Sequence, residues 1–551
     1  MSNSDAIAIA IAGELRTLKA GIATSMPNNP ALAGWSAYAQ CDEDGIIREC
    51  LKRISANCPL SNTFVEIGCA DGLENNSHLL LLDGYRGVWV DGSGDKISDI
   101  HKALGGTTFE HLWALEAMVS LETSSSIAGR ARSFLGEESI DFFSLDIDGN
   151  DWHVLASFIE RLNPKLVCVE YNAKFPPPTR VVMQYSANHT WKNDDFFGAS
   201  LQSWVDALRA HGYSLVCCNL SGANAFFVKN ELLSGFTTYE VSELYQPARY
   251  HLVNAAKGHA PSLKWSAEVI NNAPSAAVRF VTTHALNSSF PFGIHTGTDQ
   301  FISGDLARDG VWEPFETQVF SRLCKPGDSV LDLGANIGWY STIAAKILGD
   351  NGSILAFEPD ETNARVLEMN LAISDKFSIT EVVRAAVADK ETNALFYKSD
   401  FNLGDHRLFS DGSSREVNSV PVTTLDTIFK GNNIKLPDIV KSDTQGSEAK
   451  ILRGASTLFI NGWRPIMILE FWPFGLSQSG DNPLDLWVKL VDLGYSIYEL
   501  SEATPVLKLL TKELLSERLN GDISPAAQGF INLCCIPANS ERLSLISDLI
   551  L

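Results

Sequence analysis

The chain has 551 residues, of which 45% are hydrophobic and 20% are charged, and its formal net charge is −23 at pH 7. This length exceeds one ordinary hydrophobic core, so we expect more than one domain. The negative charge argues against binding to nucleic acid, which needs dense Lys and Arg, and no basic amphipathic stretch indicates a membrane surface.

Targeting signals and cysteine use indicate a cytoplasmic protein. Residues 6–12 alternate between Ala and Ile and are followed by Gly13. No basic region precedes them and Asp5 stands in front, so we expect a short helix and not a signal peptide. No apolar run approaches the roughly 18 residues of a transmembrane segment. The ten cysteines lack CxxC pairs and metal-ligand spacing, so we expect them to be reduced.

The first half of the chain alternates short apolar runs with helix-like segments, which is typical of a parallel sheet covered by helices. A helical lead-in over residues 1–39 precedes this domain, which we place at 40–232. Residues 233–276 lose the pattern, and we interpret them as a connecting region with short helices. Strands are predicted at 63–68, 87–91, 140–146, 165–171, 213–219 and 224–228.

The second domain, predicted at 277–540, shows the same alternation. Residues 277–310 contain turn-forming Asn, Ser and Gly and are expected to form hairpins, and a helix is expected from Trp312 to Phe320. Further strands are predicted at 329–333, 353–357, 379–385, 393–398, 438–442, 465–470, 495–499 and 529–536.

The two halves contain the same motifs in the same order. Phe64–Gly72 corresponds to Val330–Gly338, because each is an apolar run that ends in an acidic residue and two glycines. The other pairs are Val88–Asp91 with Leu355–Glu358, Phe142–Gly149 with Ile439–Gly446, Val167–Glu170 with Ile466–Glu470, and Gly212–Ser214 with Gly494–Ser496. Five collinear pairs predict two tandem Rossmann-like α/β domains, each with a mostly parallel sheet flanked by helices.

The motif with the clearest chemistry begins at Asp332, which leads into Gly334 and Gly338 before a helix. The glycines allow a sharp turn and close ligand approach, and the helix N-terminus favours an anionic group. Glu358 ends the next predicted strand, where a carboxylate accepts ribose hydroxyls. Dinucleotide dehydrogenases carry GxGxxG without a leading acid, so the order found here argues against an oxidoreductase and favours an S-adenosylmethionine cofactor, with Asp332 addressing its cationic methionine end.

Further motifs extend this pattern. They are Trp312-Glu-Pro, Asp332-x-Gly-Ala-Asn-x-Gly, Phe357-Glu-Pro, Arg384-Ala-Ala-Val, Asn402-Leu-Gly-Asp-His-Arg, Val422-Thr-Thr-Leu-Asp, Lys441-Ser-Asp-Thr-Gln-Gly-Ser-Glu and Leu452-Arg-Gly-Ala. Residues 277–537, which contain these motifs, resemble an FkbM-type methyltransferase domain. The resemblance implies O-methylation of a hydroxyl on a sugar, glycan or related natural product. The cofactor-binding residues that it implies are Asp332, Gly334, Asn336, Gly338, Tyr340, Glu358 and Ala386.

A sugar hydroxyl is a poor nucleophile at neutral pH, so we expect a catalytic base near the transferred methyl group. The candidates at or near carboxyl-side strand ends and in the polar loop are Asp443, Glu448, Glu470 and His406. Asp443 is the first choice because it ends a predicted strand and precedes Gly446. His406 is the second, since His titrates near working pH. The structural alternatives are that His406 is only a surface loop histidine and that Glu470 only binds backbone N–H groups.

The first half retains candidate cofactor residues at Glu66, Gly68, Asp91 and Asp146. Asp146, Asp148 and Asp151 also resemble the strand-end cluster by which macrocin-type O-methyltransferases hold Mg²⁺, and oxygen ligands suit that ion. Helix N-capping and dipole matching also explain these three residues and are the favoured interpretation. The first half is therefore either a second methyltransferase or a non-catalytic module that recruits a glycan or a partner enzyme. The sequence permits a homodimer and leaves the oligomeric state open.

Overall fold

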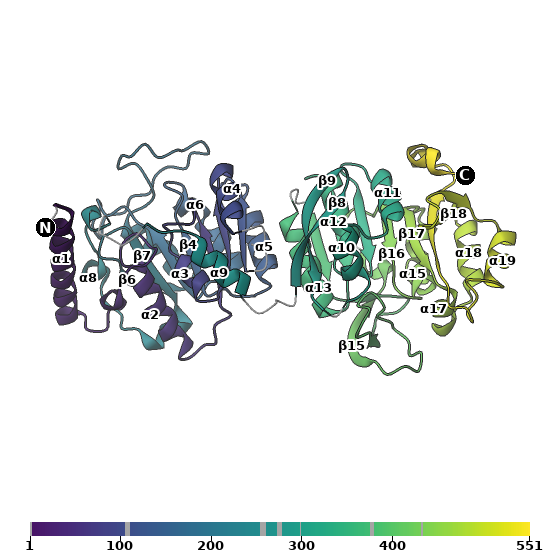
Figure 1. Cartoon of the computed structure of the whole chain (residues 1–551), viewed down its shortest axis with the longest axis horizontal. Helices are drawn as coiled ribbons and strands as arrows, with labels where there is room; N and C mark the ends of the chain where they lie inside the picture. The colour runs from purple at the N-terminus through teal and green to yellow at the C-terminus, as the bar shows by residue number, and fades with distance from the viewer. Residues whose placement is uncertain are drawn as a thin grey trace. The chain divides into compact units, whose positions relative to one another are not determined.

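The computed structural model describes residues 3–104, 111–253, 260–272, 278–297, 299–374, 379–430 and 434–551. The chain divides into two compact units, Met1–Pro274 and Ser275–Leu551, which are described separately below as the first and second units (Figure 1). The predicted junction between residues 276 and 277 lies outside the described residues.

The first unit is built on a seven-stranded sheet with the order β3-β2-β1-β4-β5-β7-β6. β1 to β5 pair in parallel, and β7 is antiparallel to both β5 and β6. The strands are β1 Thr63–Ile67, β2 Arg86–Asp91, β3 Leu112–Glu116, β4 Phe142–Leu145, β5 Leu166–Glu170, β6 Tyr213–Cys218 and β7 Asn224–Lys229. β3 was not predicted, because Leu, Trp, Ala and Glu also suit a helix, and pairing with β2 overrides that local preference.

Helices surround this sheet, and some of them lie in the predicted connecting region. They are α1 Asn3–Ser25, η1 Pro30–Ala33, α2 Glu43–Ser55, α3 His78–Leu82, α4 Gly94–Leu104, α5 Ser124–Leu135, α6 Asp151–Leu162, α7 Leu201–Ala210, η2 Asn230–Gly235, α8 Val241–Leu244, η3 Tyr250–Leu252 and α9 Lys264–Asn272. α9 packs against α3 and α4, where His78 Nε2 and Ser266 Oγ are 2.6 Å apart. Part of residues 233–276 therefore completes the first unit.

The second unit repeats the strand order on an eight-stranded sheet, β12-β11-β10-β16-β17-β20-β18-β19. β10, β11, β12, β16 and β17 pair in parallel, and β20 is antiparallel to β17 and β18. The strands are β10 Ser329–Leu333, β11 Ser353–Phe357, β12 Ile379–Val383, β16 Ile439–Ser442, β17 Ile466–Phe471, β18 Tyr495–Leu500, β19 Leu507–Leu509 and β20 Ile531–Pro537. The predicted fold class, two mostly parallel sheets flanked by helices, is confirmed.

Two smaller sheets belong to the second unit. One is the hairpin of β8 Val278–Ala285 and β9 Ser288–His295, and the other combines β13 Ala386–Val387, β14 Thr392–Lys398 and β15 Glu416–Thr423. The hairpin prediction was wrong for the last part of residues 277–310, where α10 spans Ile302–Asp309. Asp299 accepts the backbone N–H of Ser303 at 2.8 Å, which favours a helical start that the turn-rich composition concealed.

The remaining helices of the second unit lie around its main sheet (Figure 1). They are α11 Pro314–Leu323, α12 Trp339–Leu348, α13 Glu361–Ile373, α14 Leu425–Ile428, α15 Glu448–Gly454, α16 Ser456–Ile460, α17 Pro473–Gln478, α18 Pro483–Asp492, α19 Lys512–Leu519 and η4 Glu541–Leu549. Among the described residues, none of the helices is both long and apolar enough to cross a membrane.

Both faces of the second sheet are buried. Adjacent strand residues alternate between two hydrophobic clusters, so that Cys534 joins one cluster and Cys535 joins the other. This alternation follows from the period of two along a strand, and it requires helices on both faces. The core on both faces of the sheet therefore holds the strand ends, and their polar side chains, in fixed positions.

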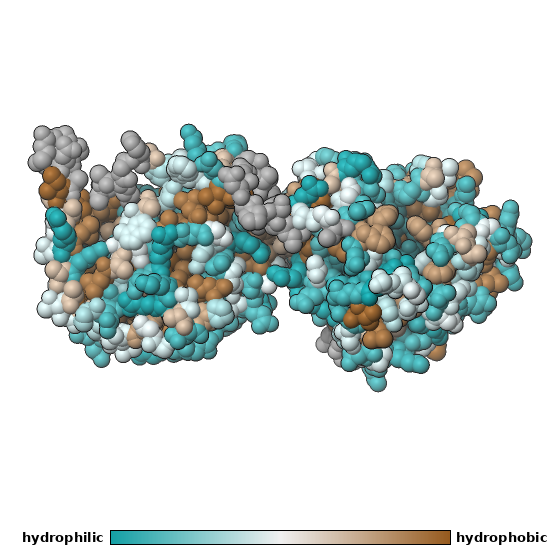
Figure 2. Space-filling model, turned by 60° about the horizontal axis from the view of Figure 1, so that its bottom comes forward, coloured by the Kyte–Doolittle hydropathy of each residue, from teal (hydrophilic) through white to brown (hydrophobic). Residues whose placement is uncertain are grey.

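On the face of each unit shown in Figure 2, hydrophobic residues form groups within a largely hydrophilic surface.

Candidate cofactor and acceptor pocket

The turn after β10 brings the backbone close to the neighbouring strand. Gly334, Asn336 and Gly338 all have positive φ, at 74°, 50° and 86°. A Cβ on Gly334 would lie 2.0 Å from the backbone oxygen of Asp443, and one on Gly338 would lie 2.3 Å from Leu367 Cδ1. Both glycines are therefore required by packing as well as by backbone conformation, and α12 begins directly after the turn.

Glu358 fixes the conformation of this turn. Its Oε2 accepts the backbone N–H of Asn336 at 2.8 Å, and its Oε1 accepts the backbone N–H of Asp360 at 2.8 Å. The residue is 4% exposed, and burial raises the pKa of Glu358 to about 8. Each oxygen retains a lone pair for another donor, so the carboxylate is suited to accept ribose hydroxyls.

Asp332 has a different environment from the one that the sequence suggested. It is 2% exposed, its Oδ2 accepts Ser341 Oγ–H at 2.6 Å, and burial raises its pKa to about 6. Among the described residues, Asp332, Gly338 and Tyr340 are not part of the pocket wall. Asp332 and Tyr340 contribute to the packing of α12 on the sheet, through Ser341 and Lys441 respectively, whereas Gly334, Asn336, Glu358 and Ala386 face the pocket.

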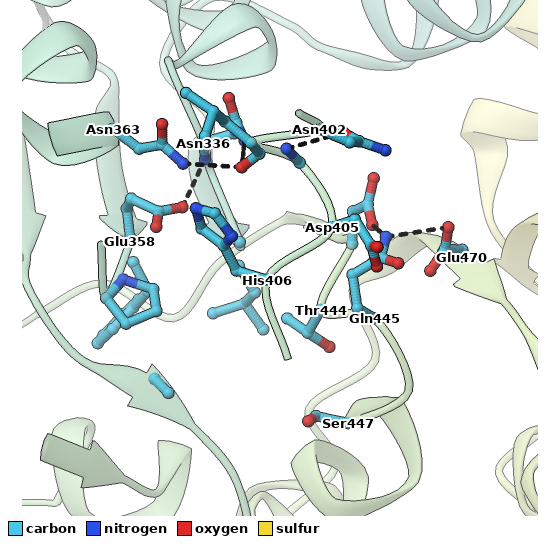
Figure 3. Close-up of a pocket in the computed structure, with 18 of the residues that line it drawn as sticks. Asn336, Glu358, Asn363, Asn402, Asp405, His406, Thr444, Gln445, Ser447 and Glu470 are labelled. Carbon is cyan, nitrogen blue, oxygen red and sulfur yellow. Dashed lines mark hydrogen bonds between the residues drawn. The ribbon is translucent and has the colours of Figure 1, made fainter. Parts of the chain in front are cut away.

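A single pocket of about 350 Å³ joins two chemically different ends (Figure 3). We call Gly334, Asn336, Glu358 and Ala386 the cofactor end. A second group of wall residues, which we call the carboxylate end, consists of Glu313, Asp443, Gln445 and Glu470. The volume of the whole pocket lies within the range of ordinary small-molecule sites.

An amide connects two carboxylates at the carboxylate end. Gln445 Nε2 donates to Asp443 Oδ1 at 2.8 Å and to Glu470 Oε1 at 3.2 Å. Burial raises the pKa of both acids, and for Glu470 the charge of Asp443 raises it further. Gln445 has a φ of 52°, and this left-handed conformation lies in the turn between β16 and α15. Predicted candidates Asp443 and Glu470 are therefore brought together at the pocket.

Glu448, another candidate base, lies outside the described pocket wall. Its Oε1 accepts the backbone N–H and the hydroxyl of Thr444 at 3.0 and 2.8 Å. Burial raises its pKa to about 7. These contacts give Glu448 the structural role of holding the turn that carries Asp443.

His406 lines the pocket with a defined tautomer. Its Nδ1 accepts the backbone N–H of Ser399 at 3.0 Å, so in the neutral ring Nε2 carries the proton. Burial lowers the pKa of His406 to about 4. The Nε2 atom is buried without a hydrogen-bond partner among the described residues. At neutral pH this arrangement favours hydrogen-bond donation by His406 over removal of a proton.

Glu313 lines the pocket, although we predicted no role for it from the sequence. It precedes α11 with a φ of 41°, and its carboxylate accepts Tyr340 Oη–H at 2.8 Å and Asn532 Nδ2–H at 3.2 Å. Burial raises its pKa to about 8. The motif Trp312-Glu-Pro was the available signal, but its place in the pocket depends on β20, which is distant in the sequence.

The loop 399–412 closes one side of the pocket. The carbonyl of Leu403 accepts the side-chain amides of Asn336 at 2.8 Å and Asn363 at 3.0 Å. Arg407 pairs with Asp405 at 2.6 Å, and its guanidinium lies 4.8 Å from the ring centroid of Trp472. The loop is thus attached both to the glycine turn and to the opposite wall.

The first unit reproduces the geometry of the glycine turn. Gly68, Ala70 and Gly72 have φ values of 87°, 50° and 72°. Asp91 Oδ2 accepts the backbone N–H of Ala70 at 2.8 Å, and its Oδ1 accepts that of Ser93 at 2.8 Å. Glu66 instead accepts the N–H groups of Asn76 and Ser77 together with the Ser77 hydroxyl, and burial raises its pKa to about 7.

The predicted metal cluster of the first unit has a different membership in the structure. Carboxylate oxygens of Asp146, Asp148 and Glu170 all lie within 4.8 Å of one another. Asp151 is used otherwise, since its two oxygens accept the N–H groups of Ile147 and Gly149 at 2.6 and 2.8 Å. These contacts hold the loop that precedes α6, and a role of Asp151 as a metal ligand stays a prediction. The sheet supplies Glu170 from β5, which spacing alone does not reveal.

Solved structures of methyltransferases resemble parts of the chain at low sequence identity. A putative rRNA methylase from Clostridium thermocellum is 10% identical, over 40% of this chain and 91% of its own, with a TM-score of 0.24. A TehB-like methyltransferase from Corynebacterium glutamicum is 12% identical over 42% and 93%, with a TM-score of 0.24. An O-methyltransferase from Thermotoga maritima is 11% identical over 50% and 83%, with a TM-score of 0.23.

A family model gives the more specific result. Residues 332–497 match the methyltransferase FkbM domain, and this range contains the glycine turn, Glu358, the loop 399–412 and the strand ends of β16 and β17. The match covers part of the second unit and confirms the predicted enzyme class, a methyltransferase.

Proposed function

We propose that the second unit transfers a methyl group to a hydroxyl of a sugar, glycan or related natural product. The observation that carries this proposal is the continuity of one pocket from Glu358 to the Asp443–Gln445–Glu470 group. A cofactor held at one end would present its reactive group to a hydroxyl at the other. When bound, S-adenosylmethionine supplies an electrophilic methyl group on a positively charged sulfur.

The cofactor end fits this group in shape and in hydrogen bonding. Gly334 leaves room where a side chain would strike the Asp443 backbone, and Glu358 keeps lone pairs available for a ribose. The wall also includes Phe357, Ala386 and Val387, which supply an apolar surface for an aromatic base. Gly334, Asn336, Glu358 and Ala386 would therefore hold the cofactor.

Asp443 is the residue that we assign as the base. It lies in the wall beyond the glycine turn, and Gln445 orients its carboxylate through one hydrogen bond. A pKa raised by burial makes a carboxylate a stronger base, since the best catalytic pKa lies near the working pH. Transfer from sulfur to oxygen otherwise depends on alignment and on exclusion of water. His406 would donate a hydrogen bond in this arrangement.

A second proposal concerns the first unit, which we assign as a non-catalytic module that recruits the acceptor or a partner enzyme. One observation favours it over a second active site. The ten-residue α12 of the second unit has only a five-residue counterpart in α3. The cysteines among the described residues are free thiols, and we place the whole reaction in the cytoplasm.

The test is transfer of labelled methyl groups from S-adenosylmethionine to a panel of sugar nucleotides, lipid-linked glycans and small hydroxylated natural products. We expect labelled ether products that form with the wild-type chain and at a reduced rate with Asp443→Asn. Products methylated on nitrogen or carbon would contradict the proposal, as would failure of S-adenosylhomocysteine to bind in calorimetry. Sedimentation of the same preparation would show whether the chain is a homodimer.

A further inference from the structure

We infer that the carboxylate end accepts an uncharged, hydroxyl-rich ring and discriminates against a ring that carries a carboxylate, sulfate or phosphate. The inference rests on the proposed function and adds the charge of the acceptor to it. Three features of the described wall carry it: an unpartnered oxygen, an excess of acidic groups and an aromatic surface.

The unpartnered oxygen is Glu470 Oε2. Glu470 is 7% exposed, and only its Oε1 receives a hydrogen bond, from Gln445. Oε2 is buried without a partner among the described residues, although leaving a buried polar atom unsatisfied is unfavourable. Because Glu470 lies in the pocket wall beside Gln445 (Figure 3), a hydroxyl of the acceptor can supply the missing donor.

The charge of the wall is one-sided. Its described residues include five acidic side chains and no Lys or Arg. The acidic members are Glu313, Glu358, Asp405, Asp443 and Glu470. An anionic substituent on the acceptor would enter this wall without a positive partner, and burying an unpaired charge is strongly unfavourable.

The nearest buried cation is already paired. Lys441 is 2% exposed, and its Nζ lies 2.6 Å from Glu316 Oε1 and 4.8 Å from the centroid of the Tyr340 ring. Arg407 is likewise engaged by Asp405 and Asp411. Neither side chain is available to an anionic acceptor unless an existing ion pair breaks.

Aromatic side chains line the same pocket and complement a ring with apolar C–H faces. Trp312 and Trp472 belong to the wall, together with Phe301 and Phe530, which are 47% and 55% exposed. Aromatic surface combined with a few polar groups is typical of sites that bind small organic ligands. A neutral sugar offers both an apolar face and hydroxyl donors, whereas an anionic sugar adds a charged group for which the described wall holds no Lys or Arg.

The test uses saturation-transfer NMR on the full chain with S-adenosylhomocysteine present. The probes are neutral methyl glycosides in the gluco, galacto and manno configurations, each paired with its uronic acid counterpart, and an amino-sugar glycoside. We expect at least one neutral glycoside to bind, with its uronate at least tenfold weaker. Equal or tighter binding of the uronate would overturn the inference, and so would preference for the amino sugar or failure of every neutral probe to bind.

Glu470→Gln separates the charge of this residue from its shape. We expect the variant to reduce the preference for the neutral glycoside over its uronate by at least threefold, while its affinity for S-adenosylhomocysteine is unchanged. Glu499→Gln is the matched control, because Glu499 is 8% exposed on the same sheet but outside the described pocket wall. An unchanged preference in Glu470→Gln would contradict the role of this carboxylate.

The inference and the proposed function can fail separately. Neutral glycosides that bind selectively but never receive a labelled methyl group would contradict O-methylation of a sugar and leave the charge selectivity standing. Methyl transfer to the hydroxyl of an anionic ring would support the proposed function and overturn the inference.

Discussion

The two units share one backbone plan but differ in the residue that lies between two strand-end carboxylates. In the second unit the residue is Gln445, whose φ is 52°, and in the first unit it is Asp148, whose φ is 56°. The amide joins Asp443 to Glu470, whereas Asp148 adds a third acid beside Asp146 and Glu170. A different residue at the corresponding backbone position of the two units thus gives a hydrogen-bonded pair in one and a cluster of three acids in the other.

The comparison also separates two functions of the acidic residues near the glycine turn. Asp91 and Glu358 each accept two backbone N–H groups in corresponding positions, so their geometry is retained in both units. Asp332, in contrast, lies outside the described pocket wall, which Glu358 lines. The acid at the end of the second strand is therefore the one placed to contact a ligand.

Glu358→Ala should have the largest effect. We expect the affinity for S-adenosylhomocysteine to fall on the order of 1,000-fold, because the change removes two hydrogen bonds to the ribose and two that fix the glycine turn, each worth about 1 kcal/mol. Calorimetry on the full chain measures this loss. Asp91→Ala is the matched change in the first unit, and we expect it to leave methyl transfer unaltered. Loss of transfer in Asp91→Ala alone would reverse the roles of the two units.

Glu66→Gln should remove a pH dependence of stability from the first unit. The folded-state pKa is about 7, above the unfolded value near 4.5, so the contribution of Glu66 is full below about pH 4.5 and is lost as the pH rises through 7. The difference amounts to about 3 kcal/mol. Denaturant unfolding, followed by hydrogen exchange in β1 peptides, should show a flatter pH profile in the variant. If the free energy of unfolding of the variant changed with pH as that of the wild type does, the raised pKa of Glu66 would be contradicted.

Asp443→Asn tests the proposed base. We expect kcat to fall about 100-fold, as is common when a general base is removed, while the affinity for S-adenosylhomocysteine changes less than threefold. The pH profile of the wild-type enzyme provides the second measurement. If His406 were the base, His406→Gln would abolish an inflection near its pKa of about 4 and lower kcat as strongly as Asp443→Asn does.

Local patterns predicted the turn and the strand-end acids, because a strand, an acid and two glycines determine their own surroundings. Gly334, Glu358 and Asp443 lie at the pocket for this reason. Contacts between distant segments were not predictable in the same way. Glu313 reaches the pocket through Asn532 on β20, and Glu170 lies beside Asp146 through the pairing of β4 with β5. Spacing along the chain carries no information on either contact.

The smallest expected effect concerns the residue that distinguishes the two units. Asp148→Gln should stabilise the first unit by about 1–2 kcal/mol in metal-free buffer, since an amide would replace one of three neighbouring acids. The reciprocal Gln445→Asp should destabilise the second unit by a similar amount and lower the affinity for neutral glycosides. Denaturant midpoints for each variant, measured with EDTA, decide the question. A lower midpoint in Asp148→Gln would contradict this prediction. It would mean that the Asp148 side chain makes stabilising contacts that an amide cannot make.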